Sequence, residues 1–213
     1  MILYWILLIL TALIAYLFGS LDTMVLASNF VFRRNLRRLG NETTWFSNFR
    51  RVYGIGGFVR LLVIELVKDI IPVLIGGLLL SIKGHPEVGR AFAGFCLVLG
   101  RLYPAIYVFR GGSAAMALVV AACAMEMSVG IAAGVVMIAV IVLTRYISLG
   151  VFAGAAICAV ISVVMLDVTV MLRLALFTSG LVLIRHIPAL IRVLGKKEPR
   201  LSFKEDITYK LDE

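Results

Sequence analysis

The chain has 213 residues, 62% of them hydrophobic, and its mean hydropathy is +1.06. Soluble domains are roughly half apolar, so this composition excludes an ordinary soluble domain and predicts an all-α polytopic membrane protein. The formal net charge of +9 does not indicate nucleic-acid binding, because Lys and Arg stand in short blocks between apolar runs, where they set topology and contact anionic lipid.

Several apolar runs reach or approach the length of about 20 residues that a membrane-spanning helix needs. We predict about seven transmembrane helices, at 2–20, 55–81, 89–109, 113–128, 129–146, 149–166 and 168–185. The first is interpreted as a retained helix, because Met1 to Phe18 lacks the basic start and the cleavage site of a signal peptide. We expect one integral membrane domain over 1–200 and a polar cytoplasmic tail over 201–213.

The basic residues predict the orientation. The first large loop holds six arginines between Arg33 and Arg51, and the C-terminal segment after Arg185 is also basic. The positive-inside rule places both on the cytoplasmic side. We therefore expect an external N-terminus, a cytoplasmic C-terminus and an odd number of crossings, with the candidate substrate loops on the cytoplasmic face.

The loop from Ser28 to Gly54 is longer than a connection between two spans requires. We expect it to pack as a re-entrant or interfacial element. Arginines between Arg33 and Arg38 recur at helical spacing beside apolar residues, a pattern typical of a short basic helix at the lipid headgroups.

Three ionisable residues, Glu65, Lys68 and Asp69, lie within the second predicted span and share one helix face. Charges are costly at this depth, so they require partners or a wet cavity. Two interpretations stay open at this point, a structural set of ion pairs and a substrate site. A small transporter or channel built around these charges is a third, weaker hypothesis.

The turn at Gly111-Gly112 follows Arg110 and precedes a new apolar run that begins at Ser113. Adjacent glycines allow backbone N–H groups to converge, and the next helix N-terminus adds unpaired donors, so the turn is suited to a phosphate. A plain turn between two helices is the alternative.

Other polar residues on the predicted cytoplasmic side are Arg51, Arg101, Arg145, Ser148 and Arg185. Such a set suits a phosphorylated substrate whose apolar part rests in the bilayer. The sequence has no Ser-His-Asp arrangement, H-x-x-x-x-D acyltransferase signature or Walker sequence. Its three cysteines lie in apolar runs without metal-ligand spacing, so we expect neither a metal nor a cofactor.

Taken together, these segments resemble the bacterial acyl-phosphate-dependent glycerol-3-phosphate acyltransferases, an integral membrane family. Leu39 to Arg51 is similar to L-G-S-G-N-x-G-A-T-N-x-x-R, and Glu65-x-x-Lys68 to D-x-x-K-G. The segment from Gly100 to Ala117 resembles G-H-x-F-P-x-x-x-x-F-K-G-G-K-G-V-A. Thr144 to Gly150 matches T-R-Y-x-S-L-G, and Arg185 to Glu198 is similar to R-H-R-x-N-I-x-R-L-x-x-G-x-E.

The resemblance implies a bacterial plasma-membrane enzyme that joins acyl phosphate to glycerol 3-phosphate, or to a related phosphorylated acceptor, giving lysophosphatidic acid. In that family the cytoplasmic loops hold the two substrates together without an acyl-enzyme. The substrate-binding candidates that the resemblance implies are Asn48, Arg51, Arg101, Gly111, Gly112, Ser113, Ser148, His186, Arg192 and Glu198.

The sequence departs from these motifs at several positions. Arg101 replaces a histidine, Ser113 replaces the lysine after Gly-Gly, and Ala189 replaces an asparagine. A lysine beside a phosphate contributes on the order of several kcal/mol, whereas a serine hydroxyl contributes about 0.5–1.5 kcal/mol. The alternative hypothesis is therefore a non-catalytic relative that binds a phospholipid, an acyl phosphate or a membrane partner.

Overall fold

The computed structural model describes residues 1–23, 45–105, 113–166, 169–195 and 197–198. The described residues form helices throughout, and no strand occurs among them. In chain order the helices are α1 (Ile2–Ser20), α3 (Trp45–Ser81), α4 (Pro86–Leu102), α5 (Ala115–Met125), α6 (Met127–Thr144), α7 (Ile147–Met165) and α8 (Thr169–Leu194).

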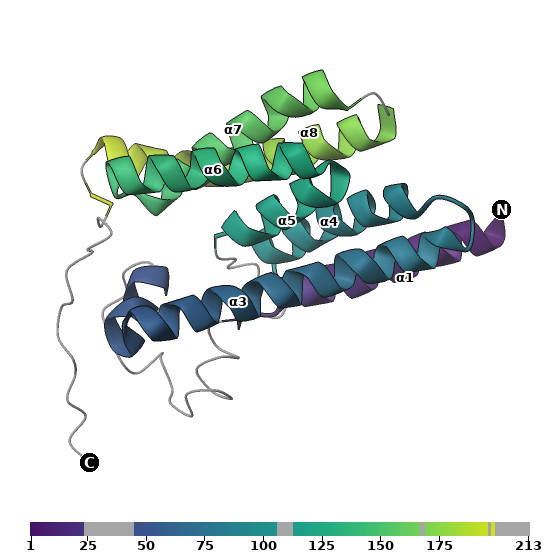
Figure 1. The fold of residues 1–213 in the computed structure, drawn as a ribbon, viewed down its shortest axis with the longest axis horizontal. Coiled ribbons are helices and arrows are strands. Elements are labelled where there is room, and N and C mark those ends of the chain that lie inside the picture. Colours follow the sequence, from purple (N-terminus) through teal and green to yellow (C-terminus); the bar gives the residue numbers. More distant parts are fainter. Residues whose placement is uncertain (24–44, 106–112, 167–168, 196, 199–213) are drawn as a thin grey trace, which may run out of the picture.

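Successive helices run in opposite directions along one long bundle (Figure 1). Helices α4 and α5 lie between the α1 and α3 pair on one side and α6, α7 and α8 on the other, and they contact both groups. As a result, the C-terminal ends of α1, α4, α6 and α8 point toward the same end of the bundle as the N-terminal ends of α3, α5 and α7 (Figure 1).

The helix boundaries follow local backbone chemistry. Gly54 has a φ of 67°, which interrupts α3 and separates a short first part from the long straight part. This break lies where the sequence predicted the second span to begin. Helix α4 ends at Leu102, earlier than the predicted 109, because Tyr103 precedes Pro104 and adopts a non-helical conformation.

Helix α8 extends to Leu194, well past the predicted end of the last span at 185. The prediction stopped at Arg185, but a membrane helix continues into the headgroup region where arginine side chains reach water. Arg185, His186 and Arg192 therefore lie on one helix instead of in a tail.

Four helices, α1, α6, α7 and most of α8, are long and apolar enough to cross a membrane, and many of their large apolar side chains are exposed. Helix α3 carries Glu65, Lys68 and Asp69 within its span, and α5 has only 11 residues. Seven crossings stay a prediction.

Close packing between α1 and α4 depends on two glycines. A methyl group at Gly19 would clash with the carbonyl oxygen of Leu97, and one at Gly100 would clash with that of Tyr16. Such close approach is typical of membrane helices, where small residues allow backbones to pack. The crossing fixes the C-terminal end of α4, where Arg101 lies.

Candidate functional site

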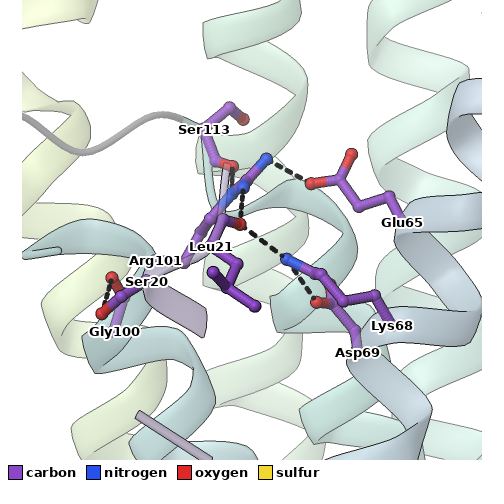
Figure 2. Close-up of polar contacts among 8 residues, drawn as sticks. All are labelled: Ser20, Leu21, Glu65, Lys68, Asp69, Gly100, Arg101 and Ser113. Atoms are coloured by element: carbon purple, nitrogen blue, oxygen red, sulfur yellow. Dashed lines mark hydrogen bonds and ion pairs between the residues drawn. The ribbon is translucent and has the colours of Figure 1, made fainter. Parts of the chain in front are cut away.

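Arg101, near the end of α4, is buried and contacts three other segments of the chain (Figure 2). Its Nη2 forms an ion pair with Glu65 on α3. Its Nε donates to the carbonyl oxygen of Ser113 at 3.2 Å, and its Nη1 donates to the carbonyl oxygen of Leu21 at 3.3 Å. One guanidinium group thus links α3, the end of α1 and the residues that precede α5.

A second ion pair lies beside the first. Lys68 Nζ lies 3.1 Å from Asp69 Oδ1 and also donates to the Leu21 carbonyl oxygen at 3.1 Å. We call Leu21, Glu65, Lys68, Asp69, Arg101 and Ser113 the helix-end network (Figure 2). It has two cationic and two anionic side chains, so it is balanced in charge, and these side chains form ion pairs of the kind that the structural interpretation expects.

One hydrogen bond and one cation–π contact at Tyr103, just after α4, connect α1 and α4 to α8. The Tyr16 hydroxyl on α1 donates to the Tyr103 carbonyl oxygen at 2.7 Å, and the Arg185 guanidinium lies 6.0 Å from the centre of the Tyr103 ring. A cation over an aromatic face at this distance is attracted to it. Tyr103 therefore joins the α1 and α4 side of the bundle to α8.

Glu198 is the centre of a second group. Its Oε1 accepts a hydrogen bond of 2.8 Å from the Ser148 hydroxyl near the start of α7, and its Oε2 accepts one of 2.8 Å from Arg192 Nε. The Glu198 side chain is 4% exposed and that of Arg192 is 54% exposed. We call Ser148, Arg192 and Glu198 the Glu198 cluster.

His186 is buried on α8, and its Nδ1 lies 2.8 Å from the Val182 carbonyl oxygen. In this arrangement Nδ1 carries the proton, which leaves Nε2 as the ring nitrogen that can accept one. Its neighbour Arg185 is partly buried against Tyr103.

Four predicted site residues lie outside what the structure describes in atomic detail. Gly111 and Gly112 belong to the undescribed segment 106–112, and the basic helix predicted between Arg33 and Arg38 lies in 24–44. Asn48 and Arg51 lie on the first part of α3, where the backbone is helical and the side chains are not described. Their predicted roles stay predictions.

The structure places the other six predicted residues in two groups and one separate position. Arg101 and Ser113 belong to the helix-end network. The Glu198 cluster consists of Ser148, Arg192 and Glu198. His186 lies on α8, about one and a half turns before Arg192 in the chain. Sequence reasoning missed Leu21, Tyr16 and Tyr103. The contacts of Leu21 and Tyr103 use backbone carbonyl oxygens, which no side-chain pattern reports.

The arrangement offers cationic and hydroxyl groups at one end of an apolar bundle. Arg192 and Arg185 can neutralise a phosphate, and His186 can exchange a proton. Within the described part of the chain, His, Cys, Asp and Glu form no group of three that could hold a metal ion. Such a site can bind and orient a phosphorylated substrate.

The chain matches the model of the family described as glycerol-3-phosphate acyltransferase over residues 9–196. A glycerol-3-phosphate acyltransferase from Thermoanaerobacter pseudethanolicus is 27% identical over 199 residues, which cover 93% of this chain and 98% of the relative. One from Shouchella clausii is 28% identical over 201 residues, covering 92% and 97%.

Two solved structures of PlsY (YgiH), an integral membrane glycerol 3-phosphate acyltransferase, have the same fold. The glycerol 3-phosphate form gives a TM-score of 0.75 at 23% identity and covers 92% of this chain and 96% of that one. The lysophosphatidic acid form also gives 0.75, at 22% identity, covering 93% and 96%.

Proposed function

This chain belongs to the glycerol-3-phosphate acyltransferase family, and we propose that it transfers an acyl group from acyl phosphate to glycerol 3-phosphate, giving lysophosphatidic acid. It is an all-α integral membrane protein. In the reaction, a hydroxyl oxygen of glycerol 3-phosphate forms a bond to the acyl carbon, and the bond from that carbon to the phosphate oxygen breaks. The leaving phosphate takes up the proton that the hydroxyl loses.

One observation carries the proposal. The Glu198 cluster joins Ser148, from the closely matched Thr144 to Gly150 motif, to Arg192 and Glu198 from the last motif. The cluster presents a half-exposed guanidinium beside a serine hydroxyl at the end of the bundle where the predicted substrate loops meet. Positioning and charge neutralisation of this kind are sufficient to accelerate a reaction between two bound phosphorylated reactants.

Within this proposal, the site is built from the ten residues that the motifs indicate. Arg51, Arg192 and the Gly111-Gly112 turn hold phosphate groups, and His186 offers Nε2 as a proton acceptor. Ser148 donates to a phosphate when its single hydroxyl proton turns away from Glu198. Glu198 orients Arg192 and Ser148. Acyl phosphate enters from the cytoplasmic side of the cell membrane, and the basic loops contact anionic lipid.

Purified protein tests the proposal directly. With acyl phosphate and glycerol 3-phosphate, it should release inorganic phosphate and lysophosphatidic acid in equal amounts. Glycerol in place of glycerol 3-phosphate should react far less, because it lacks the phosphate that the arginines neutralise. Product formation no faster than in an Arg51→Ala control would overturn the proposal.

A second candidate function is binding without acyl transfer, to an acyl phosphate or a phospholipid headgroup. It is favoured by the engagement of Arg101 with Glu65 and by a serine at 113, where the motif has a lysine. Equilibrium binding of acyl phosphate to a protein that forms no lysophosphatidic acid would support it. Multiple turnovers by the unmodified chain would exclude it.

A further inference from the structure

We propose that Arg101 is a positioning residue that holds Ser113 in place and does not contact substrate phosphate, an inference that rests on the proposed function. Arg101 was a candidate phosphate ligand on its residue type and motif position. In the structure three of its nitrogens are engaged within the protein, by Glu65, by Leu21 and by Ser113. A phosphate would have to replace these partners.

The burial of the network argues against such an exchange. The side chains of Arg101 and Glu65 are 7% and 2% exposed, and those of Lys68 and Asp69 are 9% and 1% exposed. Removing Arg101 from Glu65 would leave a buried carboxylate without its counter-ion, which is strongly unfavourable. The same holds for Lys68 and Asp69.

Most of the unfilled hydrogen-bonding capacity of the network belongs to carboxylate oxygens. Among the described residues of the network, Glu65 Oε2, Asp69 Oδ2 and the Ser113 hydroxyl have no hydrogen-bond partner, whereas Asp69 Oδ1 faces Lys68 Nζ in the ion pair. The two carboxylate oxygens accept hydrogen bonds, so they attract donors or water and repel a phosphate, and of the three groups the Ser113 hydroxyl alone can donate to one. An incoming dianion would therefore meet two carboxylates that each keep one oxygen without a donor.

The contact from Arg101 Nε to the Ser113 carbonyl oxygen explains how the network acts on the reaction. Ser113 directly follows the predicted Gly111-Gly112 phosphate turn and precedes α5. Helix α4 is packed closely against α1 at Gly19 and Gly100. Arg101 is therefore held in a fixed position, and its hydrogen bond holds the Ser113 backbone relative to α4. It thereby fixes the residue that directly follows the predicted turn.

A double-mutant cycle tests the network without substrate. Arg101→Gln leaves Glu65 as an unpaired buried charge, Glu65→Gln leaves Arg101 unpaired, and Glu65→Gln with Arg101→Gln leaves neither. The double variant should unfold at a higher temperature than Arg101→Gln alone. If Arg101→Gln yields no folded protein, recovery of folded protein in the double variant supports the network equally well. If the stability losses of the two single variants simply add in the double variant, the network is overturned.

Kinetics then separate positioning from phosphate contact. In the double variant, KM for glycerol 3-phosphate should stay within about threefold of wild type while kcat falls roughly 10- to 100-fold, because a misplaced turn aligns the reactants poorly. A phosphate ligand would instead raise KM roughly 10- to 150-fold, and a purely structural residue would change neither constant per folded molecule. Either result overturns the positioning role.

Lys83→Gln is the matched control, because Lys83 is an exposed cation in the turn after α3, at the other end of the bundle. It should change neither the unfolding temperature nor the kinetic constants. If the unmodified protein has no acyltransferase activity, the proposed function fails, and the thermal cycle alone then decides whether the Arg101 network exists as described.

Discussion

At the scale of single residues, Glu198 connects two helices through one carboxylate. Each of its oxygens accepts one hydrogen bond, from Ser148 and from Arg192, and the side chain is almost fully buried. Hydrogen bonds to a charged group contribute about 1.5–3 kcal/mol. The orientation of Arg192 therefore depends on Glu198.

Glu198→Gln should reduce kcat/KM for glycerol 3-phosphate roughly 10- to 100-fold, because an amide offers one acceptor oxygen where the carboxylate offers two. Steady-state kinetics on purified protein measure the effect. Glu126→Gln is the control, since Glu126 is exposed and its carboxylate accepts an exposed hydrogen bond from Ser128. Equal activity of Glu198→Gln and wild type would contradict the role of the cluster.

Ser113→Lys should lower KM for glycerol 3-phosphate by about tenfold, because it places a cation beside the predicted phosphate turn. The change leaves the network intact, since Arg101 contacts the Ser113 carbonyl oxygen and not its hydroxyl. Ser113→Ala should leave KM nearly unchanged. No gain with lysine, measured by the same assay, would mean that substrate phosphate lies elsewhere.

Residue identity alone predicts that Glu65 needs a partner, but it does not predict which one. Arg101 lies 36 positions away, and the sequence associates it with the cytoplasmic polar groups instead of with α3. The pairing depends on how closely α4 approaches α1 and α3, and this is a property of backbone packing. The charge pattern gives the requirement, and the tertiary structure gives the partner.

At the scale of elements, the α1 and α4 crossing is the contact on which the network depends. Gly100→Ala should destabilise the protein by about 1–3 kcal/mol, because the added methyl would clash with the Tyr16 carbonyl oxygen. Gly56→Ala is the matched control, since a methyl group there meets no atom within 4 Å. It should stabilise α3 by about 0.5–1 kcal/mol.

Thermal unfolding in detergent micelles measures both glycine variants. A Gly100→Ala protein as stable as Gly56→Ala would show that the two helices can separate at no cost. Gly100→Ala should also lower kcat, because it moves Arg101 and therefore Ser113. A normal kcat in a destabilised Gly100→Ala protein would contradict the link between the crossing and the turn.

Hydrophobic runs predict which segments become helices more reliably than they predict where the helices end. The start of the straight part of α3 is marked by Gly54, and the end of α4 follows from Pro104, a signal that the apolar run to 109 conceals. The end of α8 is not visible in hydropathy, because Pro188 and three basic or titratable residues, Arg185, His186 and Arg192, lie inside the last part of the helix.

At the scale of the whole molecule, the helix order places the start of α1 and the end of α8 at opposite ends of the bundle (Figure 1). The groups at the C-terminal end include Arg101, Ser148, Arg185 and Arg192, whereas Lys83 and Arg90 lie toward the other end. This distribution accords with the orientation that we infer from the basic loops, with the C-terminus in the cytoplasm.

Cysteine labelling in intact bacterial cells measures that orientation. The three native cysteines are not disulfide-bonded, so they are first replaced by alanine, and then Lys83→Cys or Lys197→Cys is introduced singly. Both positions are exposed. A membrane-impermeant maleimide should label Lys83→Cys in intact cells, and it should label Lys197→Cys only after the cells are permeabilised. The opposite pattern would place the Glu198 cluster outside the cell, away from the intracellular acyl phosphate and glycerol 3-phosphate that the proposed reaction requires.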